Sequence, residues 1–120
     1  MKLRVFAHSG CETCRKALGF LVEHRVAHEV IPIREQPPSV DELRAMLGHA
    51  GGDLRKLFNT SGRDYKALGM KDRLPAMSEA EALALLAANG NLVKRPFVLS
   101  KTAGAVGFKP AEWRERFGIR

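Results

Sequence analysis

The stretch LRVFAHSGCETCRKALGFLV, residues 3–22, decides the fold because a strand and a helix meet in it at a pair of cysteines. Leu3–His8 is short and apolar, which predicts a buried β-strand. A helix is predicted from Glu12 onward, because apolar residues then recur at helical spacing. The predicted apolar stripe of this helix consists of Ala17, Leu18, Leu21 and Val22. Cys11 and Cys14 are therefore expected between the end of the strand and the first turn of the helix.

The segment that follows this helix indicates a second strand. HEVIPI, residues 28–33, is rich in β-branched residues, and Pro32 limits how centrally the strand can pair. A strand, a helix and a second strand at this spacing are typical of a βαβ unit, in which the two strands run parallel.

The middle of the chain, residues 39–88, is predicted to be a helical insert. Asp53 can cap one short helix in it, and Asp64–Leu68 indicates another. Two capping boxes, in which a glutamate follows a serine by three residues, mark the starts of longer helices. They are Ser39 with Glu42 and Ser78 with Glu81.

The last part of the chain returns to strands. RPFVLS, residues 95–100, and GAVGF, residues 104–108, flank the turn KTAG, which indicates an antiparallel hairpin. Pro110 opens a final helix, at a position where proline is tolerated. The predicted architecture is one α/β domain over residues 1–120, with a single mixed sheet and the helical insert to one side.

Composition and charge limit the class of protein. Hydrophobic residues make up 45% and charged residues 28% of the 120 residues, as in an ordinary globular domain. No apolar run has transmembrane length and the N-terminus lacks signal-peptide features, so a cytoplasmic protein that does not enter a membrane is expected. The net charge of +7 favours an anionic small molecule, nucleic acid or an acidic protein face as partner. The basic residues are spread along the chain, however, and an ordinary solvated surface explains them equally well.

The spacing of the two cysteines favours redox chemistry. Backbone N–H groups at the start of a helix, together with Arg15 and Lys16, would stabilise Cys11 as a thiolate. Cys14 lies on the same helix face and can attack a mixed disulfide formed on Cys11. In a reducing compartment, two close cysteines are more often catalytic or metal-binding than a permanent disulfide.

Two alternatives compete with this interpretation. A zinc site would need two more ligands, and the chain has no second cysteine pair and no histidines at finger spacing, so no metal is expected. The pair could also be inert, although its place between a strand and a helix is the context that redox motifs require. The histidines, interpreted as surface or strand-end residues, are His8, His24, His28 and His49.

Far along the chain, NLVKRPFVLS (residues 91–100) places Arg95 directly before Pro96. The residue before a proline is extended, and the X-Pro bond itself can be cis. The planar guanidinium of Arg95 suits a carboxylate or an oxyanion, and Lys94 could assist it. An exposed cationic pair before a strand is an equally good interpretation of these residues alone.

Four motifs together resemble the arsenate reductase-like (ArsC/Spx/YffB) branch of the thioredoxin superfamily over nearly the whole chain. They are CETCRKAL, LFNTSGRDYKALG, MSEAEALALLAANGNLVKRPFVL and AVGFKPAEW. The resemblance implies a thioredoxin-like mixed four-stranded sheet with an all-helical insert. It also implies that Cys11 is the nucleophile and that Arg95-Pro96, with the proline typically cis, binds an anion.

The chain departs from this pattern at two positions. The glutaredoxin-linked arsenate reductases that it resembles carry three arginines around the nucleophile. Only Arg95 matches, because Asn59 and Lys109 occupy the other two positions. Losing two guanidinium groups weakens bidentate oxyanion binding, so arsenate reduction is not expected.

Two functions are consistent with the resemblance. The first is a thiol-disulfide reductase without a bound cofactor, in which Cys11 attacks, Cys14 resolves and Arg95 holds an anionic thiol such as glutathione. Its reductant would be glutathione, a glutaredoxin or a thioredoxin. Further substrate contacts are expected from Ser9, Gly10, Thr13, Arg15, Lys94 and Pro96.

The second function is that of an Spx-type redox-sensing regulator. There the cysteine pair would be a disulfide switch, and the partner would be the RNA polymerase alpha subunit. A monomer without direct nucleic-acid binding is expected in both cases, and a family member with vestigial chemistry is a third option.

Overall fold

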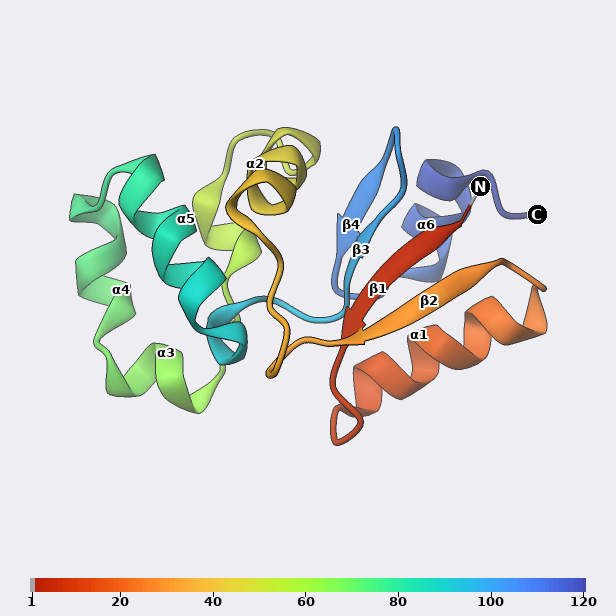
Figure 1. Cartoon of the computed structure of the whole chain (residues 1–120), viewed down its shortest axis with the longest axis horizontal. Coiled ribbons are helices and arrows are strands. Elements are labelled where there is room, and N and C mark those ends of the chain that lie inside the picture. The colour runs from red at the N-terminus through yellow and green to blue at the C-terminus, as the bar shows by residue number, and fades with distance from the viewer. Residues whose placement is uncertain (1) are drawn as a thin grey trace.

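The computed structural model describes residues 2–120 and contains one four-stranded sheet with helices around it (Figure 1). The strands are β1 Leu3–Ala7, β2 His28–Pro32, β3 Phe97–Leu99 and β4 Gly104–Val106. They lie in the order β2-β1-β3-β4, with β1 parallel to β2 and β3 antiparallel to both of its neighbours. The predicted mixed sheet, the βαβ unit and the C-terminal hairpin are therefore confirmed, and β2 with its proline is an edge strand.

Helices cover both faces of the sheet. Helices α1 Glu12–Glu23 and α6 Pro110–Phe117 lie on one face, where Trp113 is fully buried. The β1 residues on that face are Leu3, Val5 and Ala7. The opposite face carries Phe6 and Phe97, whose rings meet edge to face, and packs against the helices that connect β2 to β3. The sheet is thus the middle layer between two hydrophobic clusters.

The chain between β2 and β3, residues 40–92, is called the helical segment below, and it lies to one side of the sheet (Figure 1). Both predicted capping boxes form, at Ser39 and Ser78, and Asp53 caps the short helix that follows it. The α-helices are α2 Val40–His49, α3 Arg63–Ala67, α4 Met70–Arg73 and α5 Glu79–Ala88. The 3₁₀ helices are η1 Leu54–Leu57, η2 Leu74–Ala76 and η3 Gly90–Leu92. Across residues 2–120, no helix is long and apolar enough to pass through a bilayer.

The apolar stripe of α1 differs from the predicted one at one residue. Val22 is 68% exposed, whereas Ala17 and Leu21 are fully buried. Phe20 is buried instead, and its ring lies edge-on against Trp113 of α6. With about 100° between successive helical residues, Phe20 and Val22 lie on opposite sides of the stripe. The stripe widens toward Phe20 because α6 packs on that side.

Candidate functional site

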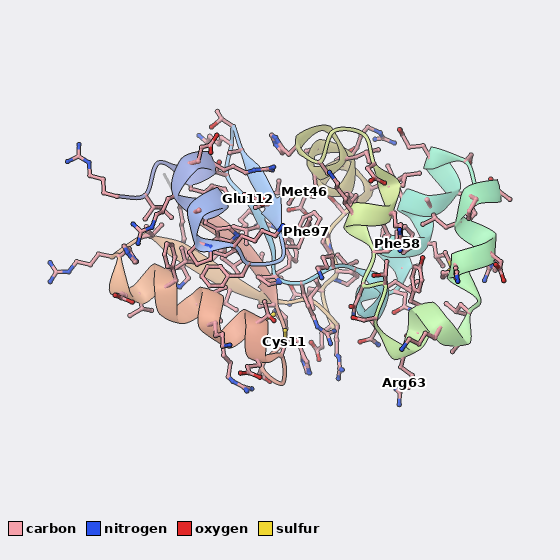
Figure 2. The ribbon with its side chains drawn as sticks, turned by 180° about the vertical axis from the view of Figure 1, so that it is seen from behind. Cys11, Met46, Phe58, Arg63, Phe97 and Glu112 are labelled. Carbon is pink, nitrogen blue, oxygen red and sulfur yellow. The ribbon has the colours of Figure 1, made fainter. Side chains whose placement is uncertain are left out.

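Cys11 lies between the end of β1 and the start of α1, so it is at the end of α1 that is nearer to the helical segment (Figure 2). It is the N-cap of α1, and its Sγ accepts a hydrogen bond from the backbone N–H of Cys14 at 3.3 Å. The N–H of Cys11 donates to the carbonyl of His8 at 3.0 Å, which closes the turn. The sulfur therefore occupies the place where a side-chain oxygen usually caps a helix, at the positive end of the helix dipole.

The pairing of β1 with β3 brings Arg95 to the same place. Phe6 pairs with Phe97 in an antiparallel register. Continued beyond the strands, two residues after Phe6 and two residues before Phe97, that register sets Arg95 opposite His8, just before the cysteine turn. The peptide bond between Arg95 and Pro96 is cis, as the family resemblance implied.

Hydrogen bonds from two sides fasten the backbone around Arg95. The N–H of Lys94 donates to the carbonyl of Leu57 in η1 at 2.8 Å. The N–H of Gly107, just after β4, donates to the carbonyl of Pro96 at 2.9 Å. Lys94 and Arg95 thus lie where the sheet and the helical segment meet.

The environment of Cys11 favours its thiolate. Burial raises the pKa of the Cys11 thiol, but hydrogen bonds from Cys14 and Arg95 and the positive charge of Arg95 outweigh burial. The pKa of Cys11 therefore lies below its ordinary value. A thiolate is the nucleophilic form of cysteine, so at a given pH a larger share of Cys11 is in the reactive form than of an ordinary cysteine.

Cys14 has the opposite character. Its side chain is fully buried in the cluster formed by α1, α6 and the sheet. The pKa of Cys14 is raised to about 12, mainly by burial and in addition by the neighbouring Cys11 sulfur. Cys14 is therefore a neutral thiol near neutral pH, and of the two cysteines Cys11 is the one that ionises first.

Alkylation should separate the two cysteines. At about pH 7 we expect iodoacetamide to modify Cys11 readily in the folded, reduced protein and to leave Cys14 almost untouched. Because the pKa of Cys11 is lowered, its thiolate and its reaction rate should persist to lower pH than those of free cysteine. Peptide mass spectrometry over a pH series measures both rates, with the urea-unfolded chain as the control. A Cys11 profile that matches free cysteine, or equal labelling of Cys14, would contradict this expectation.

The other predicted contact residues lie around the cysteine turn. The Arg15 guanidinium donates to the carbonyl of Ser9 at 3.0 Å, so in the structure Arg15 fastens the turn. Gly10 lies against the His8 ring, where an added Cβ would be 2.8 Å from Nε2. Thr13 is exposed on the first turn of α1.

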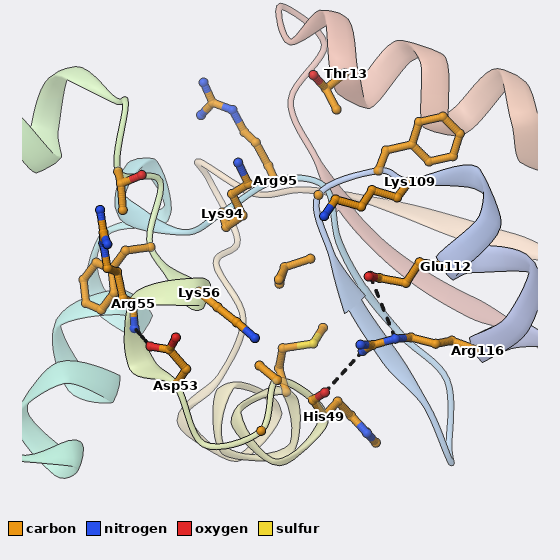
Figure 3. A pocket seen from close by; sticks show the side chains of 18 residues that line it. Thr13, His49, Asp53, Arg55, Lys56, Lys94, Arg95, Lys109, Glu112 and Arg116 are labelled. Carbon is orange, nitrogen blue, oxygen red and sulfur yellow. Dashed lines mark hydrogen bonds and ion pairs between the residues drawn. The ribbon is translucent and has the colours of Figure 1, made fainter.

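A cavity of about 870 Å³, called the main cavity below, lies between the sheet and the helical segment (Figure 3). Thr13 and Arg95 line it, which places one end of the main cavity beside the cysteine turn. Lys94, from the same predicted set, also lines it. The main cavity thus brings Arg95, Lys94 and Thr13 together, and Cys11 lies beside Arg95 two residues before Thr13.

A second cavity, of about 430 Å³, contains two arginines that the sequence reasoning missed. It is lined by Arg34, Arg63 and Arg95, so Arg95 borders both cavities. Arg34 comes soon after β2, whose carboxyl end lies beside that of β1 because the two strands are parallel, and this signal could have identified it. Arg63 begins α3 and is labelled in Figure 2 on the helical segment; no pattern in the sequence pointed to it.

His8 contributes a neutral ring to the site. Burial lowers the pKa of His8, and the charges of Arg34 and Arg95 lower it further, against the opposing effect of Glu35. The imidazole is therefore uncharged at neutral pH beside the cysteine turn. Among residues 2–120, no three histidine, cysteine, aspartate or glutamate side chains lie close enough together to hold a metal ion.

A βαβ unit joined to a β-hairpin, with C-x-x-C at the start of its first helix and a cis proline beside it, defines a thioredoxin-like thiol redox protein. Comparison with known proteins narrows this class. The sequence model of the ArsC family matches residues 6–116, and the chain belongs to that family.

Relatives and solved structures agree with this assignment. The chain is 44% identical over 117 residues to the uncharacterized protein YusI of Bacillus subtilis, a match that covers 98% of this chain and 99% of YusI. It is 28% identical over 113 residues to the global transcriptional regulator Spx of Enterococcus faecalis, covering 93% of this chain and 83% of Spx. The crystal structure of an ArsC family related protein from Bacteroides fragilis superimposes with a TM-score of 0.90 at 43% identity, covering 96% of this chain and 97% of that one.

Proposed function

We propose that the chain is a thiol-disulfide reductase linked to glutathione or a glutaredoxin, with Cys11 as nucleophile and Cys14 as resolving thiol. The Cys11 thiolate attacks one sulfur of a disulfide RSSR, forms a Cys11–S–S–R bond and releases RS⁻. Cys14 then loses its proton to solvent and attacks the Cys11 sulfur, which releases a second RS⁻ and leaves a Cys11–Cys14 disulfide. Two electrons, from two molecules of glutathione or from a dithiol glutaredoxin or thioredoxin, restore both thiols.

The observation that carries the proposal is the surrounding of Cys11. Its sulfur caps a helix, accepts a hydrogen bond from Cys14 and lies beside Arg95, and together these lower the thiol pKa. A cysteine with a purely structural role needs none of these neighbours. Arg95 and the adjacent Lys94 also supply positive charge for an anionic thiol that leaves or enters there.

The contrast between the two cysteines supports separate roles for them. The negative charge of Cys11 is one of the causes that raise the pKa of Cys14. That contribution disappears once the Cys11 sulfur is part of a mixed disulfide. Cys14 therefore becomes more acidic at the step that needs its thiolate, and its burial keeps it from reacting earlier.

Reduction of the mixed disulfide between glutathione and 2-hydroxyethanethiol, followed as NADPH consumption through glutathione reductase, tests the proposal. We expect turnover well above the rate with glutathione alone, and no turnover with arsenate, since Asn59 and Lys109 replace two arginines. A rate no higher than that of glutathione alone, with fully reduced protein, would refute the proposal.

In Cys14→Ser, a glutathione adduct on Cys11 should accumulate and be visible by mass spectrometry. Full turnover in that variant would show that glutathione, and not Cys14, resolves the adduct.

A second candidate function is favoured by the similarity to Spx of Enterococcus faecalis, whose match covers 93% of this chain. The chain would then act as a regulator that binds the RNA polymerase alpha subunit in one redox state of the Cys11–Cys14 pair. Pull-down with purified alpha subunit, under reducing and oxidising conditions, checks this function. Binding in neither state would remove this candidate.

A further inference from the structure

The main cavity is much larger than the reaction at Cys11 requires. Its volume of about 870 Å³ is in the range of pockets that hold whole organic ligands, roughly 300–1,000 Å³. A tetrahedral oxyanion or a lone carboxylate would occupy only a small part of it. The remaining space extends from Thr13 and Arg95 toward His49 and Arg116 (Figure 3).

Three lysines give the main cavity an uncompensated positive charge. Lys56 comes from η1, Lys94 from the segment before β3, and Lys109 from the residue before α6. Figure 3 shows Lys56 and Lys109 reaching into the cavity from opposite walls. Within residues 2–120, none of the three ammonium groups takes part in an ion pair.

The two acidic residues of the main cavity are already engaged. Asp53 accepts a hydrogen bond from the backbone N–H of Arg55 at 3.1 Å, as the cap of η1. Glu112 pairs with Arg116 at 3.9 Å. Arg116 also donates to the carbonyls of Gly104, at 2.8 Å, and His49, at 3.2 Å, and so joins α6 to β4 and α2. Among the residues that line the main cavity, only Glu112 and Arg116 form an ion pair, so the basic residues, with Arg55 and Arg95 besides the three lysines, outnumber the acidic ones.

Apolar side chains also line this space. Val106 and Phe108 are partly exposed there, and the buried side chains of Met46 and Phe58 lie behind the cavity surface. A cavity with apolar walls and cationic groups suits an organic molecule with anionic substituents better than a bare inorganic anion.

We propose that the main cavity binds the organic arm of the disulfide substrate and selects arms that carry at least two negative charges, contacted by Lys56, Lys94 and Lys109. The proposal rests on the proposed function, because the arm is attached to a sulfur that Cys11 attacks. The negative charges can be carboxylates, as in glutathione, or phosphates, as in coenzyme A. Lys56 is the informative residue, since the cysteine chemistry described above does not involve it.

Charge reversal at Lys56 tests the proposal, with Lys71→Glu as a matched control. Lys71 lies on the exposed surface of α4 and lines neither cavity. Because both variants replace a lysine by a glutamate, they change the net charge of the protein equally. Pre-reduced protein is mixed with glutathione disulfide, coenzyme A disulfide or uncharged hydroxyethyl disulfide, and the second-order rate of thiol loss is measured. We expect Lys56→Glu to slow the reaction with the anionic disulfides about tenfold at low salt, because a like charge replaces an attractive one. The rate of Lys56→Glu with hydroxyethyl disulfide should change less than about twofold. The same limit should hold for the rates of Lys71→Glu with all three disulfides.

The outcomes separate this proposal from the proposed function. Loss of rate in Lys56→Glu with either anionic disulfide supports the site, and the larger loss identifies carboxylate or phosphate recognition. Equal rates in Lys56→Glu and wild type with both anionic disulfides would overturn it. If wild type reacts with none of the three disulfides, the proposed reductase function is refuted. Titration calorimetry with the unreactive S-methylglutathione and S-methyl coenzyme A then tests separately whether the main cavity binds such an arm. Binding that is lost in Lys56→Glu then supports the site, and absence of binding to wild type overturns it.

Discussion

Replacing Cys11 with serine should lower the rate of disulfide reduction by a factor of about 1,000 or more. A serine hydroxyl is not ionised near neutral pH, so it cannot replace the thiolate that the helix start and Arg95 stabilise. Serine is itself a favoured N-cap, so Cys11→Ser should keep α1 and the fold intact. Stopped-flow measurement of thiol release from glutathione disulfide gives the rate, and circular dichroism confirms that the fold is retained.

Cys14→Ser is the matched control, because it makes the same exchange of sulfur for oxygen three residues further on. We expect this variant to carry out the first step, attack on the disulfide, within a few-fold of the wild-type rate. A Cys11→Ser variant that keeps more than about a tenth of the wild-type rate would contradict the assignment of Cys11 as nucleophile.

Replacing Arg95 with alanine should slow alkylation of Cys11 about tenfold near pH 6. The Arg95 charge and hydrogen bond are among the causes that lower the Cys11 pKa, so the pKa rises when Arg95 is removed. A hydrogen bond to a charged group contributes about 1.5–3 kcal/mol, and about 1.4 kcal/mol corresponds to a factor of ten. Because Cys11 is partly exposed, solvent weakens its interaction with Arg95, and the expected loss of rate lies at the lower end of this range.

The pH dependence distinguishes two roles of Arg95. With uncharged iodoacetamide, the difference between Arg95→Ala and wild type should vanish at high pH, where both proteins carry the thiolate. With glutathione disulfide, a residual deficit at high pH is expected if Arg95 also contacts the anionic substrate, as proposed. Arg95→Lys should restore part of the rate, and Arg44→Ala, on the exposed face of α2, serves as the control. An alkylation profile unchanged in Arg95→Ala would contradict the role of Arg95 in lowering the pKa.

Short-range rules made much of the fold predictable from the sequence. The βαβ unit, the hairpin before Pro110 and the capping boxes at Ser39 and Ser78 all depend on neighbours within a few residues. The exposure of Val22 could not be predicted from neighbouring residues, because it depends on where α6 packs against α1. The short α4 and the 3₁₀ helices η2 and η3 have few residues and weak local signals.

The candidate site was predictable to a similar degree. Cys11 and Cys14 are three residues apart in the sequence, and the resemblance to a family favoured the anion-binding interpretation of Arg95 over that of an exposed cation. Arg63 and Lys56 were missed because only the packing of the helical segment on the sheet brings them to the two cavities. Local sequence carries no information about such distant neighbours. Arg34 was missed although its place just after β2 was a usable signal.

The order of the strands has a consequence for the newly made chain. Cys11 leaves the ribosome early, but Arg95 and β3, which inserts beside β1, are translated more than eighty residues later. Until the closing hairpin pairs with β1, Cys11 lacks the Arg95 guanidinium that lowers its pKa. A polypeptide that has not yet reached β3 therefore carries a more ordinary thiol, and the full nucleophilicity of Cys11 arises only after β3 has been made.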